Sequence, residues 1–122
     1  MRMHKDLEVW KRAIEFVVSI YKLTETFPKE ERYGLTAQMR DSSVSIPSNI
    51  AEGAGRNSNK EYIHFLYISL GSAAELETQL IISDKLNYIK KNKNFYFTEI
   101  VEIIRMLHGL ITSRKRLDAS KK

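Results

Sequence analysis

The sequence predicts an all-α fold, an antiparallel up-down-up-down four-helix bundle, in a chain of 122 residues. Apolar residues recur every three or four positions through four long stretches, as in helices that bury one face. Only two prolines and five glycines interrupt the chain. Short loops between the stretches favour antiparallel neighbours. No stretch alternates apolar and polar residues as a half-buried strand would.

The first helix is expected over residues 6–26, ending where the residue before Pro28 is pushed out of the helical region. The second is expected over residues 30–52. Pro47 lies well inside it, so the second helix should be kinked there or broken into two pieces. Gly53 and Gly55 then provide a helix end.

The third helix, over residues 59–89, opens with a capping box in which Ser58 and Glu61 satisfy free backbone amides. Its apolar surface is too broad for a single neighbour, which predicts packing on several sides. The fourth helix is expected over residues 96–116, and residues 117–122 are expected to form a frayed tail.

Size and composition predict one domain spanning residues 1–122. Cysteine is absent, which excludes disulfides, thiolate metal sites and cysteine nucleophiles. No apolar run is long enough to cross a membrane, and residues 1–10 lack the apolar core of a signal peptide. We therefore expect a cytoplasmic protein without a membrane partner.

The net charge of +5 permits an anionic partner. In the predicted topology the N-terminus, the loop between the second and third helices and the C-terminus share one end. We expect its cations to contact the phosphates of RNA or DNA, although a solvated helix end is an alternative. These predicted contacts are Arg2, Lys5, Arg56, Lys60, Arg114, Lys115 and Arg116. The opposite end collects Lys29, Lys85, Lys90, Lys91 and Lys93.

Two polar lines follow helix faces at spacings of three and four residues. They are interpreted first as a polar seam that sets helix register and subunit packing; a pore lining or a partner site is the alternative. Glu52 and Arg56 are candidates to pair with Glu75 and Gln79 across the two helices. The two lines consist of Ser45, Asn49, Glu52 and Arg56, with Ser42 before them, and of Ser72, Glu75 and Gln79.

The sequence offers little for catalysis. Glu61 and His64 form one E-x-x-H, whereas bundle di-iron sites use this spacing twice. The loop with Gly53, Gly55 and Arg56 lacks the spacing and lysine of a phosphate-binding P-loop. We expect no enzyme activity, no catalytic residues, no metal and no cofactor.

Several motifs together resemble the four-helix-bundle family named for 23S rRNA intervening sequences. The central motif spans residues 45–53 (SIPSNIAEG) and is followed by Arg56, then residues 61–66 (EYIHFL) and 71–80 (GSAAELETQL). Residues 6–10 (DLEVW) and 105–111 (RMLHGLI) fit as well. The resemblance covers nearly the whole chain, from about residue 5 to residue 116.

The resemblance implies a homopentamer, often with a central channel. Some members are encoded in insertions within bacterial large-subunit ribosomal RNA genes. A related branch, the accessory variability determinant of diversity-generating retroelements, binds nucleic acid and a reverse transcriptase. The family brings no established catalytic residues. The sequence therefore predicts a non-enzymatic oligomer that binds nucleic acid; a protein-interaction scaffold or accessory subunit is the alternative, and a metal-dependent bundle enzyme ranks below it.

Overall fold

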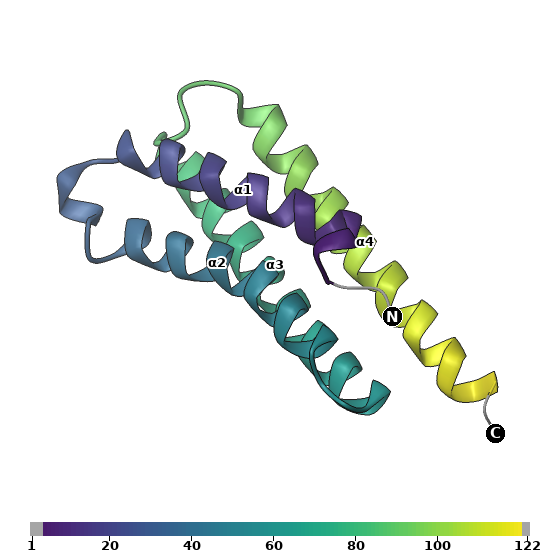
Figure 1. The fold of residues 1–122 in the computed structure, drawn as a ribbon. Coiled ribbons are helices and arrows are strands. Elements are labelled where there is room, and N and C mark those ends of the chain that lie inside the picture. Colours follow the sequence, from purple (N-terminus) through teal and green to yellow (C-terminus); the bar gives the residue numbers. More distant parts are fainter. Residues whose placement is uncertain (1–3, 121–122) are drawn as a thin grey trace.

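The computed structural model describes residues 4–120, which form four α-helices and two short 3-10 helices. The α-helices are α1 (Glu8–Glu25), α2 (Leu35–Ala54), α3 (Asn59–Lys85) and α4 (Lys93–Ser120). The 3-10 helices are η1 (His4–Asp6) before α1 and η2 (Lys29–Glu31) between α1 and α2. Each α-helix packs against its neighbours in the order α1, α2, α3, α4 and back to α1, which confirms the predicted bundle (Figure 1).

The core is apolar and lies between the four helices. Phe16 and Ile20 of α1, Leu76 of α3 and Ile103 of α4 are at most 2% exposed. Burying a side chain of this kind contributes about 1.5–3 kcal/mol. No helix among residues 4–120 is both long and apolar enough to cross a membrane.

The second helix begins later than expected and runs without a break. Residues 29–31 form η2, and Gly34 precedes the first turn of α2. Pro47 lies buried inside α2 with helix on both sides, so the expectation of two helical pieces is wrong. Figure 1 shows the ribbon of α2 changing direction along its length. Pro47 has no N–H to donate to the Ser43 carbonyl one turn earlier. Near the proline, the Asn49 side-chain amide donates to the Ser45 carbonyl at 2.9 Å.

The third and fourth helices differ in extent from the prediction. Helix α3 ends at Lys85, because Asn87 adopts the left-handed conformation (φ 62°) and turns the chain. Helix α4 is longer at both ends and continues to Ser120. The frayed tail predicted for 117–122 is therefore helical as far as residue 120, and residues 121–122 lie outside the described part of the chain.

Helix lengths give the bundle two unlike ends. At 1.5 Å per residue, the 18 residues of α1 span roughly 27 Å, whereas the 28 residues of α4 span roughly 42 Å. The α2–α3 connection and the last turns of α4 therefore extend past the start of α1 (Figure 1). The candidate functional end is consequently built from three helices only.

Candidate functional site

The extended end of the bundle is fixed by an interlocked pair of side chains on α3 and α4. The Asn59 amide donates to the Arg114 backbone carbonyl at 2.7 Å, and Arg114 Nε donates back to Asn59 Oδ1 at 2.7 Å. The Arg114 guanidinium also lies 4.7 Å from the ring centroid of Tyr62. Burial raises the pKa of Tyr62, and the charge of Arg114 acts in the opposite direction. Neutral groups thus hold this arginine in place.

The next cations along α4 remain unneutralised. Lys115 donates to the Tyr67 hydroxyl, and its ammonium lies 5.0 Å from the Tyr67 ring centroid. Lys60 and Arg116 are exposed. Within residues 4–120, no carboxylate forms an ion pair with these cations or with Arg114. We call Lys60, Arg114, Lys115 and Arg116 the basic end.

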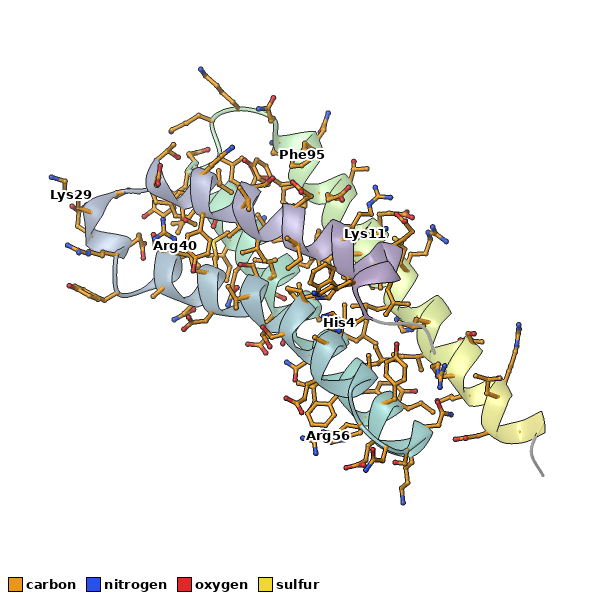
Figure 2. All side chains as sticks on the ribbon, viewed as in Figure 1. His4, Lys11, Lys29, Arg40, Arg56 and Phe95 are labelled. Carbon is orange, nitrogen blue, oxygen red and sulfur yellow. The ribbon has the colours of Figure 1, made fainter. Side chains whose placement is uncertain are left out.

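Arg56 differs from the basic end because two carboxylates neutralise it. One guanidinium nitrogen lies 2.9 Å from Glu52 and another lies 3.8 Å from Glu61. Its guanidinium also lies 4.8 Å from the Phe65 ring centroid. Figure 2 shows Arg56 at the α2–α3 end of the bundle, as predicted. Its charge is nevertheless already engaged, which makes Arg56 a structural clamp on the connection.

Lys5, the predicted N-terminal contact that the structure describes, lies apart from the basic end. Arg2 falls outside the described residues, and Lys5 is exposed in η1. The Arg12–Glu99 ion pair, with nitrogen and oxygen 2.9 Å apart, shows that Arg12 of α1 and Glu99 of α4 lie at the same height along the bundle. Arg114 lies 15 residues further along α4, roughly 22 Å, whereas Lys5 lies only seven residues before Arg12. The short α1 therefore leaves Lys5 roughly 12 Å, or about two helical turns, from the basic end.

The polar lines predicted from sequence meet at one point only. The Ser45 and Ser72 hydroxyls are 2.7 Å apart across α2 and α3, and Asn49 Nδ2 donates to Ser45 Oγ at 2.9 Å. Deeper in the same interface, Ser69 donates to the Ile46 carbonyl at 2.9 Å. We call this group the polar seam. Its internal hydrogen bonds support the structural interpretation.

The antiparallel register explains why the other polar residues do not pair. With Ser45 opposite Ser72, seven residues further along α2 brings Glu52 opposite Phe65. Phe65 lies ten residues before Glu75, so Glu52 and Glu75 are separated by roughly 15 Å along α3. The pairing considered between Glu52 or Arg56 and Glu75 or Gln79 is therefore wrong. Glu75 is exposed.

Gln79 presents the one buried side-chain polar atom without a partner among the described residues. Its Oε1 atom is inaccessible to solvent and accepts no hydrogen bond. An unpaired buried carbonyl oxygen costs about 1–3 kcal/mol. The face of α3 that carries Gln79 also exposes Ile82 (43%) and Leu86 (49%).

Sequence reasoning missed the role of Gly53, which it assigned to a helix end. Helix α2 continues to Ala54, and Gly53 is buried against α3. A Cβ atom at this position would lie 2.9 Å from Phe65 Cβ and 3.1 Å from the Tyr62 carbonyl oxygen. Gly53 thus permits a close approach of the two helices at Tyr62 and Phe65. These facing residues are large, and the small residues Ser69 and Ser72 lie further along α3, so the sequence carried no local signal for this contact.

The E-x-x-H motif is used for helix capping. The Glu61 backbone amide donates to Ser58 Oγ at 3.1 Å, which confirms the predicted capping serine, and the Glu61 carboxylate also contacts Arg56. His64 is exposed and stacks edge-on against Phe65. Within residues 4–120, no three His, Asp or Glu side chains gather as a metal site would require.

Comparisons with known proteins give a consistent family assignment. Residues 5–109 match the model of the 23S rRNA-intervening sequence protein family. A crystal structure of a protein of unknown function from Bacteroides thetaiotaomicron, described as a member of the S23 ribosomal protein family, is similar with a TM-score of 0.78 and 27% identity. The alignment covers 85% of this chain and 95% of that one. No curated protein matches. The fold, the motifs and the matched residues show that the chain belongs to the 23S rRNA-intervening sequence protein family.

Proposed function

We propose that this protein is a non-enzymatic homo-oligomer that binds nucleic acid through its basic end. One observation carries the proposal: four cations gather at the basic end and, among residues 4–120, have no carboxylate partner. Some cations elsewhere are paired with acids: Arg12 pairs with Glu99, and Lys93 pairs with Asp84 at 3.3 Å. Unneutralised cations attract phosphates and gain entropy when counterions are released.

Aromatic rings at the basic end suit a flexible nucleic-acid partner. Tyr67 is 45% exposed and lies beneath Lys115, while Tyr62 lies beneath Arg114. Proteins that bind single strands combine basic residues along the backbone with aromatic rings on which bases stack. Such a surface suits RNA with unpaired bases, including structured RNA. Because its contacts are to phosphates and to the faces of bases, it should bind with little dependence on base sequence.

Self-association is supported by the apolar residues that α3 exposes. Ile68, Ile81 and Ile82 are 39%, 43% and 43% exposed, and we propose that they are buried between subunits. A ring of copies would repeat each basic end around one axis and strengthen the local field. The pentameric number comes from the family resemblance.

Two measurements test this proposal. Filter binding to a structured RNA should show affinity that falls steeply between low and high salt, with little dependence on base sequence. Light scattering should give a mass several times the 14.2 kDa of one chain. Absence of binding at low salt, or binding that salt leaves unchanged, would refute the nucleic-acid part. A clean monomer at micromolar concentration would refute the assembly.

A protein-interaction scaffold is the second candidate, and an apolar groove between α1 and α2 favours it. The groove has a volume of about 340 Å³ and is lined by Trp10, Ile14, Val18, Val44 and Pro47 among others. A protein partner, such as a reverse transcriptase, would be retained by the assembled protein and lost when Val18 and Val44 are changed to Asp. Salt-dependent RNA binding that survives those changes would favour the first candidate.

A further inference from the structure

A second basic region lies at the opposite end of the bundle, in a pocket between the end of α1 and the α3–α4 loop. The pocket has a volume of about 330 Å³, at the lower limit of the roughly 300–1,000 Å³ typical of small-molecule sites. Its lining includes three lysines and three neutral polar side chains, so we call it the lysine pocket. These residues are Lys22, Lys90, Lys91, Thr26, Asn92 and Tyr96.

The charge of the lysine pocket is uniformly positive. No carboxylate lines it, and within residues 4–120 none of its three lysines forms an ion pair. The nearby Asp84 is already bound to Lys93, which lies outside the lining. Three lysines line one pocket, so an anion bound there would be attracted by several positive charges and repelled by no lining carboxylate.

The C-terminal end of α1, which borders the lysine pocket, has a capped backbone carbonyl. The Leu23 carbonyl accepts from the Thr26 amide at 3.0 Å and from the Thr26 hydroxyl at 2.7 Å. The negative end of α1 is thereby partly satisfied before any ligand arrives. On the other side, α4 begins at Lys93 with no acidic residue in its first turn, so the positive end of its dipole is uncompensated.

The pocket is held in shape by the loop that forms it. Ile89 is 8% exposed and anchors the loop in the core, and Asn92 adopts a left-handed conformation (φ 59°) that turns the chain into α4. The Tyr88 hydroxyl donates to Glu31 at 2.9 Å. The Tyr96 hydroxyl is protonated at neutral pH and can donate, and burial raises its pKa further. A preformed site binds with a smaller ordering cost.

We propose that the lysine pocket binds a phosphate monoester, carried either by a free nucleotide or by the phosphorylated end of a nucleic acid. Lysines recognise phosphate as mobile point charges, and the Asn92 amide and the Tyr96 hydroxyl add donors. The Thr26 hydroxyl already donates to the Leu23 carbonyl. The remaining volume accommodates more than the phosphate itself. This site is separate from the proposed nucleic-acid contact, because it lies at the other end of the bundle from Lys60 and Arg116.

Calorimetric titration tests the proposal with a nucleoside monophosphate, inorganic phosphate, and one oligonucleotide prepared with a 5′-phosphate or a 5′-hydroxyl. The pocket variant is K90Q/K91Q. The matched control K29Q/K85Q removes the same charge at the same end but outside the lining. We expect at least tenfold weaker monophosphate binding in the pocket variant and a change under twofold in the control. Circular dichroism establishes that both variants are folded.

The outcomes separate the sources of phosphate and the two proposals. Preference for the 5′-phosphorylated oligonucleotide over the 5′-hydroxyl form identifies a nucleic-acid end, and binding of the monophosphate alone identifies a nucleotide. Equal losses in both variants, or no binding of any phosphate probe, would overturn the lysine pocket as a site. A K60Q/R116Q variant should lose RNA affinity and keep monophosphate binding, so failure of one proposal leaves the other measurable.

Discussion

The polar seam and the basic end were both candidate functional sites in the sequence, yet their side chains differ in whether they have partners within the protein. Ser45, Ser69 and Ser72 complete their hydrogen bonds inside the α2–α3 interface. Lys60 and Arg116 at the basic end are exposed and, among residues 4–120, have no carboxylate partner. A polar group with an internal partner stabilises the fold, whereas an unneutralised surface charge remains available to a ligand. Changes in the seam should therefore alter stability, and changes at the basic end should alter binding.

The largest effect is expected for Gly53→Ala, in the α2–α3 interface beyond the polar seam. The added methyl group would lie 2.9 Å from Phe65 Cβ and 3.1 Å from backbone, so α2 and α3 must move apart. We expect a loss of about 1–3 kcal/mol in the free energy of unfolding, as for other overpacked cores. Urea denaturation measures this loss.

Gly109→Ala is the matched control. Gly109 is exposed on α4, and nothing lies within 4 Å of the added Cβ atom. It should stabilise the protein by about 0.5–1 kcal/mol, since alanine loses less backbone entropy in a helix. Equal effects of the two substitutions would show that close helix approach at Gly53 is unimportant.

Neutralising the basic end should affect binding and leave stability unchanged. The K60Q/R116Q variant removes two exposed cations and is expected to bind structured RNA about tenfold more weakly at low salt. The slope of log affinity against log salt should fall by about 2, one for each phosphate contact. An unchanged slope would place the phosphate contacts elsewhere on the molecule.

Ser69→Ala tests the hydrogen bonding of the seam with a smaller expected effect. Its hydroxyl donates to the Ile46 carbonyl at 2.9 Å and is fully buried. Loss of this bond should cost about 1 kcal/mol in unfolding free energy, with RNA affinity retained. Ser113→Ala, on the exposed surface of α4, serves as the control. A fall in RNA affinity without a fall in stability would assign the seam to the ligand.

Arg56→Gln should have the smallest effect on binding, although sequence placed this residue among the nucleic-acid contacts. Glu52 and Glu61 already neutralise it, so we expect RNA affinity to change by less than twofold. Exposed ion pairs of this kind contribute about 0–1 kcal/mol to stability. Binding as weak as in K60Q/R116Q would instead return Arg56 to the interface.

Local patterns were sufficient to predict the four helices, their antiparallel order and the capping role of Ser58, because each follows from residues close in the chain. The register between α2 and α3 could not be predicted from the sequence. It depends on which turns of α2 and α3 face each other, and it placed Glu52 opposite Phe65, roughly 15 Å along α3 from Glu75. The shortness of α1 likewise separated Lys5 from the basic end. Neutralisation of a charge is a three-dimensional property, and the ion pairs of Arg56 are the reason we expect it to contribute less to binding than the sequence suggested.

Crosslinking of the assembled wild-type protein to structured RNA, with the attached peptides mapped by mass spectrometry, tests the central claim most directly. The account predicts crosslinks to Lys60, Lys115 and the neighbouring Tyr67, and their loss at high salt. Crosslinks concentrated instead on the α2–α3 face between Ser45 and Gln79 would contradict it, because the polar lines would then be the binding surface and the basic end a solvated helix terminus.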